Sequence, residues 1–106
     1  MLKSRITTSV LLPKHRPPTH PGAMLWEEYL RPMGITQAAL ARHLGWSQAR
    51  VNELVRGKRG VSPEAALALS DALGTSPELW LNLQRNHELW HARQKHRPKA
   101  RLRAAV

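Results

Sequence analysis

Cysteine and phenylalanine are absent from these 106 residues, and tyrosine occurs once. Without cysteine, the chain can build neither a disulfide framework nor a thiolate zinc site. Acidic residues are scarce as well, with 7 Asp and Glu against 17 Lys and Arg, which gives a formal net charge of +10. No acid lies before Glu27 or after Glu88. Because the positive charge is so unevenly distributed, we expect it to attract a polyanionic partner and not only to keep the protein soluble.

Long hydrophobic runs are missing too. No segment approaches the roughly 20 apolar residues of a membrane span. The apolar stretch that follows Arg5 is interrupted by Thr7, Thr8 and Ser9 and ends at Pro13, which makes a poor secretion signal. We therefore expect a cytoplasmic protein whose length suits one small domain.

Prolines, glycines and helix-capping residues predict an all-α fold with three regions. Prolines exclude a continuous helix from residues 1–20, which we expect to form an arm that is flexible or pairs as a short strand over 6–12. A five-helix domain should span 21–94. Its helices are expected at about 21–30 (ended by Pro32 and Gly34), 36–44, 48–56, 63–73 and 77–94. Residues 95–106 form a basic tail.

Cations at every second position from Arg93 to Arg103 mark that tail. In an extended chain they would point the same way, as in an arm that follows DNA phosphates. The alternative is a frayed terminus that aids solubility, and the sequence leaves both open.

The second and third predicted helices form a helix-turn-helix pattern. Thr36 and Ser47 are suitable N-caps, and Gly45 stands where the chain must leave the first of the two helices. A small Ala41 allows the two helices to cross closely over a short turn. The pattern predicts binding to double-stranded DNA through the 48–56 helix.

One face of that helix carries side chains that suit base edges. Gln and Asn match adenine, Arg matches guanine, Glu accepts from cytosine, and Ala can touch a thymine methyl. A solvated polar face is the ordinary alternative, but the turn chemistry, the charge and the basic loop after the helix favour DNA. The predicted DNA-binding residues are Thr36, Gln37, Trp46, Ser47, Gln48, Ala49, Arg50, Asn52, Glu53, Arg56, Lys58 and Arg59.

About two-thirds of the chain, from about Pro21 to Arg93, resembles the lambda-repressor-like (XRE) helix-turn-helix family, and within it the HigA-type antitoxins. The narrower resemblance rests on His20-Pro21-Gly22, on residues 51–54 with Arg56-Gly57, on Lys58-Arg59-Gly60-Val61-Ser62, and on residues 75–84. It implies a homodimer that binds a partly palindromic operator and neutralises a co-encoded RelE-like ribonuclease. It also implies that Gln37 and Gln48 contact phosphate and base, that Ala49 and Glu53 read bases, and that Lys58 and Arg59 contact the backbone.

A stripe on the last helix, formed by Trp80, Leu83, His87 and Trp90, is the expected dimer interface, because its residues recur every three or four positions. The toxin-binding surface stays unknown. Candidates are Ile6, Val10, Leu11 and Leu12 of the arm and the acidic pair Glu27-Glu28. A stand-alone repressor of the same fold, without a toxin, is the second hypothesis.

Residues 87–91 read His-Glu-Leu-Trp-His, which matches the H-E-x-x-H pattern of zinc peptidases. The spacing places both histidines on one helix face. A third ligand is missing at metzincin spacing, since position 97 is Arg, and so small a chain has no second lobe to form a cleft. We therefore expect no enzyme activity, no cofactor and no bound zinc, and keep a zinc peptidase as the remote alternative.

Overall fold

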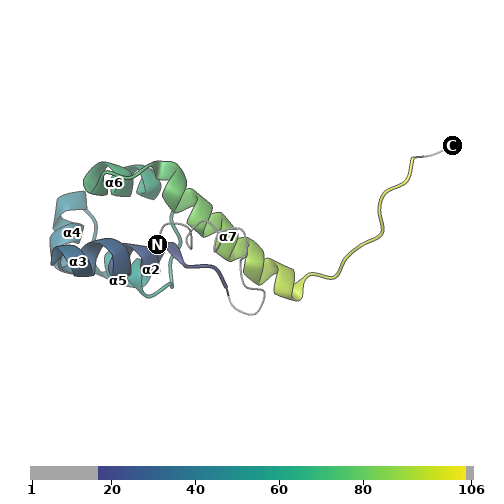
Figure 1. Cartoon of the computed structure of the whole chain (residues 1–106), viewed down its shortest axis with the longest axis horizontal. Coiled ribbons are helices and arrows are strands. Elements are labelled where there is room, and N and C mark those ends of the chain that lie inside the picture. Colours follow the sequence, from purple (N-terminus) through teal and green to yellow (C-terminus); the bar gives the residue numbers. More distant parts are fainter. Residues whose placement is uncertain (1–16, 105–106) are drawn as a thin grey trace, which may run out of the picture.

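The computed structural model describes residues 17–104, and within them it is all-helical (Figure 1). The elements are α2 (Pro21–Met24), η1 (Leu25–Leu30), α3 (Arg31–Met33), α4 (Gln37–Leu44), α5 (Gln48–Val55), α6 (Pro63–Leu73) and α7 (Pro77–Lys95). Because α2, η1 and α3 follow one another without a break, the predicted five-helix fold is confirmed. No helix among these residues is both long and apolar enough to cross a bilayer. Most of the expected arm, with its candidate strand at 6–12, lies outside the described residues.

The helices begin directly after the capping residues predicted from the sequence. Thr36 Oγ1 accepts from the N–H of Ala39 at 3.0 Å, and Ser47 Oγ accepts from the N–H of Arg50 at 3.0 Å. Ser62 and Ser76 cap α6 and α7 in the same way. Each bond satisfies one of the backbone N–H groups that a helix start leaves without a partner.

The first helix runs past Pro32, contrary to the prediction that this proline helps to end it. The helix widens to a π-turn over η1, and the N–H of Arg31 donates to the carbonyl of Trp26, five residues back. A proline inside a helix lacks one donor and crowds the carbonyl four residues earlier, and here the π-helix lies directly before the segment that contains Pro32. Gly34, with a φ of 68°, ends the helix.

The core lies where these helices meet. Leu25, Leu30, Val51 and Leu69 are fully buried and pack with Trp80. Trp80 is 0% exposed, and its indole N–H donates to Thr75 Oγ1 at 2.7 Å. Its inclusion in a dimer stripe was therefore wrong, because a monomer core of this size does use the large indole.

The other three stripe residues lie further along α7, and all are half-buried. Leu83 packs against the core, whereas His87 and Trp90 are not part of it. The helix itself continues to Lys95, so Arg93 and Lys95 belong to it and not to an extended tail. The proposed row of alternating cations shortens to Arg97, Lys99, Arg101 and Arg103, all exposed.

Candidate nucleic-acid interface

The second helix of the helix-turn-helix, α5, buries one side and exposes the other. Val51 and Leu54 are buried against the core. Gln48 and Ala49 are exposed in the first turn, and Arg56 is exposed at the C-cap. A helix exposed along one side in this way has the shape that enters a major groove.

Asn52 is tied to the preceding helix. Its Nδ2 donates to Oε1 of Gln37 at 3.1 Å, and both side chains are partly buried. The bond joins α4 to α5 on the side where the predicted phosphate and base contacts lie. Each amide keeps free hydrogen-bonding capacity, since Asn52 Oδ1 and Gln37 Nε2 are not used in this bond.

Glu53 pairs with Arg59. Its Oε1 accepts from Nε of Arg59 at 3.1 Å and from Nη2 at 2.9 Å, and the two side chains are about half exposed. The pair orients the arginine of the basic loop. Glu53 therefore has a role beside the predicted base reading, which the sequence pattern did not indicate.

Trp46, in the turn before α5, positions Arg50. The guanidinium carbon of Arg50 lies 3.8 Å from the centroid of the Trp46 ring, a cation–π contact. The indole also packs against the core. Arg50 is thus held beside the first turn of α5 by a rigid neighbour.

Thr36 and Ser47 use their hydroxyl oxygens as helix caps, and any DNA contact from them would use the remaining hydrogen-bonding capacity of those hydroxyls.

A basic loop follows α5 at residues 57–60. Gly57 has a φ of 75°, a left-handed conformation that a side chain would strain. The N–H of Gly57 donates to the carbonyl of Leu54 at 3.0 Å, and the N–H of Lys58 donates to that of Glu53 at 2.8 Å. This pairing is the Schellman motif, which closes a helix end and fixes the path of the next residues. Lys58 is exposed beyond it.

The histidines of the H-E-x-x-H pattern face other histidines. The His87 ring lies 4.8 Å from that of His20 and 4.5 Å from that of His91, centroid to centroid. Burial lowers the pKa of His87, and the nearby His91 lowers it further, against a raising effect of Glu88. Glu88 Oε2 accepts from Nε2 of Gln84 at 2.8 Å.

Among residues 17–104, no three His, Asp or Glu side chains gather in a way that could hold a metal ion. The absence of zinc from the protein stays a prediction.

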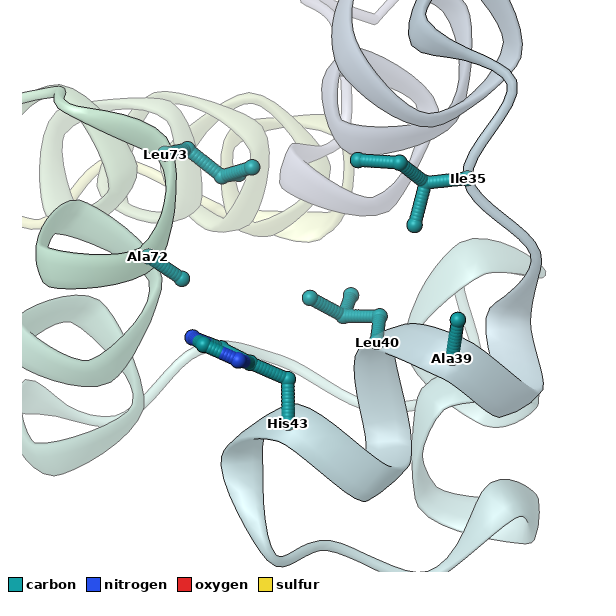
Figure 2. A pocket seen from close by; sticks show the side chains of 6 residues that line it. All are labelled: Ile35, Ala39, Leu40, His43, Ala72 and Leu73. Atoms are coloured by element: carbon teal, nitrogen blue, oxygen red, sulfur yellow. The ribbon is translucent and has the colours of Figure 1, made fainter.

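A shallow apolar hollow of about 240 Å³ lies between α4 and α6 (Figure 2). Only one of its lining residues, His43, is ionisable, so the hollow offers no pair of groups for acid–base catalysis.

Sequence reasoning assigned Gln84 of α7 no role beyond the resemblance of residues 75–84, but its Oε1 accepts from the N–H of Val61 at 2.8 Å. This bond ties α7 to the end of the basic loop. The signal available in the sequence was Gly60, a glycine in the loop that no turn type required. The pairing across 23 residues could not be read from local spacing.

Comparison with known proteins gives one consistent result. Residues 27–80 match the family described as helix-turn-helix, HTH_3. The chain is 41% identical to antitoxin HigA-1 of Vibrio cholerae over 87 residues, which cover 82% of each chain. It is 45% identical to virulence-associated protein I of Dichelobacter nodosus over 78 residues, 74% of this chain and 72% of that one.

Solved structures of antitoxins also resemble this chain in sequence and fold. Antitoxin GraA in complex with its operator is 48% identical, with a TM-score of 0.71 over 76% of this chain and 82% of that chain. Antitoxin HigA of Pseudomonas aeruginosa, solved with the higBA promoter, is 41% identical, with a TM-score of 0.71 over 74% and 85% of the two chains.

Proposed function

This chain belongs to the helix-turn-helix family HTH_3 and is a DNA-binding regulator of the HigA type, and we propose that it is an antitoxin that represses its own operon. In this proposal a homodimer binds a palindromic operator and neutralises a co-encoded RelE-like ribonuclease. The chain has no catalytic role of its own. Both proposed partners, DNA and a ribonuclease, place its action in the cytoplasm.

The observation that carries the DNA part is the exposed polar face of α5 beside the basic loop, on a fold shared with antitoxins solved on operator or promoter DNA. Within this face we assign Gln48, Ala49, Arg50, Asn52 and Glu53 to base edges. The backbone contacts are assigned to the residues around them, which are Thr36, Gln37, Trp46, Ser47, Arg56, Lys58 and Arg59.

Two variants separate these roles. Gln48→Ala should relax sequence preference, with a loss of about 1–3 kcal/mol at the matched base. Lys58→Ala should weaken operator and scrambled DNA alike and lower the slope of log K against log salt by about 1. Both are measured by fluorescence anisotropy over a salt series. A change of sequence preference caused by Lys58→Ala alone would contradict the assignment of α5 as the reading helix.

Binding of the proposed toxin must depend on short-range surface contacts, because a basic chain gains no long-range electrostatic attraction to a basic ribonuclease. Two exposed acids lie on the first helix, and of these Glu27 already pairs with Arg31 at 2.9 Å. Glu28 is exposed as well. The apolar arm residues of the other candidate surface lie outside the described residues.

Growth rescue tests the neutralisation. Cells that express the toxin gene next to this one should recover when the chain is co-expressed. Deleting residues 1–18 should weaken toxin capture in a pull-down and leave operator binding nearly intact, since His20 and the helices remain. If co-expression gives no rescue, or no toxin-like gene is adjacent, a stand-alone repressor is the function that remains.

A further inference from the structure

The basic loop is fixed where it begins and where it ends. At its start, the Schellman bonds of Gly57 and Lys58 continue directly from α5. At its end, the Val61 side chain is only 5% exposed and belongs to the core cluster. Between these two points lie only Arg59 and Gly60.

A side chain from α7 makes the second attachment. Gln84 Oε1 accepts from the backbone N–H of Val61 at 2.8 Å. Gln84 Nε2 donates to Glu88 Oε2, also at 2.8 Å, one turn further along α7. The second bond holds the amide so that its oxygen faces the loop, because the nitrogen is occupied on the other side.

Gly60 fits against this amide. A Cβ at position 60 would lie 2.7 Å from Oε1 and 2.8 Å from Cδ of Gln84, closer than real Cβ contacts come. Gly60 is not among the glycines with positive φ. A side chain at position 60 would therefore have to displace the flexible end of Gln84, whereas the backbone conformation itself does not require glycine.

We propose that Gln84 is a positioning residue for DNA binding, which holds the 57–60 loop where Lys58 and Arg59 contact the phosphate backbone. The proposal rests on the proposed function, since it requires the loop to touch DNA. It also connects α7, the helix assigned to dimerisation, with the DNA-binding loop through a single amide. Without the Gln84 bond, Val61 would still anchor the loop through its buried side chain, but the backbone before it would be less fixed. Ordering Lys58 and Arg59 on DNA would then cost more conformational entropy.

The test compares two neutral substitutions on the same helix. Gln84→Met keeps the length of the side chain and the net charge but removes the amide. Gln94→Met is the matched control, because Gln94 is exposed and bonds only to the carbonyl of Trp90. Both proteins are checked by circular dichroism, and DNA binding is measured at a temperature where both are fully folded.

Gln84→Met should bind operator and scrambled DNA several-fold more weakly, and its salt slope should fall by about 0.9 for each phosphate that the loop no longer neutralises. Gln94→Met should match the parent chain. A purely structural role for Gln84 would lower the melting temperature but leave the salt slope of the folded protein unchanged, and that result would overturn the proposal.

A double variant tests the packing of Gly60 against Gln84. Gly60→Ala should weaken DNA binding because the new methyl displaces Gln84. Since Gln84→Ala removes the displaced atoms, Gly60→Ala with Gln84→Ala should bind like Gln84→Ala alone. Additive losses of affinity would overturn the proposal.

Lys58→Ala separates this inference from the proposed function. If Lys58→Ala lowers the salt slope and Gln84→Met does not, the loop contacts DNA without help from Gln84. If Lys58→Ala leaves the slope unchanged, Lys58 does not contact phosphate, and the loop assignment on which this inference rests is wrong, whereas operator binding by α5 is tested separately by Gln48→Ala.

Discussion

His20 caps the first helix with an imidazole. Its Nδ1 accepts from the backbone N–H of Gly22 at 2.9 Å, which requires that nitrogen to carry no proton. Burial lowers the pKa of His20, and the neighbouring His87 lowers it further, while Glu88 opposes both. The cap thus depends on the neutral ring.

This dependence predicts a stability change with pH. Because the pKa of His20 is lower in the folded than in the unfolded chain, the stabilisation is complete above about pH 6.5, the ordinary value, and is lost as the pH falls below it. Urea unfolding should give a lower free energy at about pH 5.5 than at about pH 7.5. His87, whose pKa is also lowered, contributes in the same direction.

His20→Asn is the matched variant, since asparagine caps a helix well and does not titrate. It should reduce the difference in unfolding free energy between the two pH values, with His87 retaining its share. An unchanged pH dependence would show that the cap is not the titrating contact.

Single residues explain why the helix boundaries could be predicted and the contacts between helices could not. Thr36 and Ser47 act within three residues of their own positions, so their roles are visible in the sequence. The bond between Gln37 and Asn52 spans 15 residues and needs the fold to bring them together. The bounds of α5, the helix proposed to face DNA, could therefore be predicted from the sequence, but the partners of its side chains could not.

At the scale of helices, α2 and α5 pack without an intervening side chain at Gly22. A Cβ on Gly22 would lie 1.6 Å from the carbonyl oxygen of Leu54 and 2.6 Å from its carbonyl carbon. Both atoms are backbone, so neither can move without moving α5. The spacing between the first helix and α5 is therefore set by this glycine.

Gly22→Ala should destabilise the fold by more than about 3 kcal/mol, the upper end of the usual cost of overpacking. Gly34→Ala is the comparison, because a side chain there meets no atom within 4 Å and is penalised only by a φ of 68°. That conformation costs roughly 1–2 kcal/mol. Urea unfolding measures both, and equal losses of stability would contradict the close packing of α2 on α5.

The first helix is also an exception to the rule that a proline ends a helix. Pro32 normally marks a helix end, and no residue pattern around it indicates the π-turn over Leu25–Leu30 that admits it. Both Leu25 and Leu30 are fully buried. The two leucines reach the core from the ends of this π-helix, a placement that local spacing does not predict.

At the scale of the whole molecule, the proposed dimer must use the part of α7 outside the core. Trp90 is half-buried and Leu89 is 43% exposed, while Leu83 already packs inside. Trp90→Asp should therefore weaken the dimer and leave the monomer folded. Light scattering over a concentration series checks the mass, and circular dichroism checks the fold. A stable monomer with full operator affinity before any substitution would exclude this interface.

The basic tail is predicted to extend the stretch of DNA that one molecule contacts. From α7 the chain runs away from the helical body (Figure 1). Arg97, Lys99, Arg101 and Arg103 are exposed, and neither ion pair in the described residues involves them. Four exposed cations next to a DNA-binding domain should add phosphate contacts outside the operator itself.

Deleting residues 97–106 should therefore lower the salt slope by up to about 3.6, at about 0.9 for each of these four cations. The full chain should also bind more tightly as the duplex is lengthened beyond the operator, whereas the truncated chain should not. Anisotropy with duplexes of increasing length measures both effects. A tail that only aids solubility would leave the slope and the length dependence unchanged. If the cations follow phosphates, their removal must reduce both, because counterion release requires contact with the added DNA.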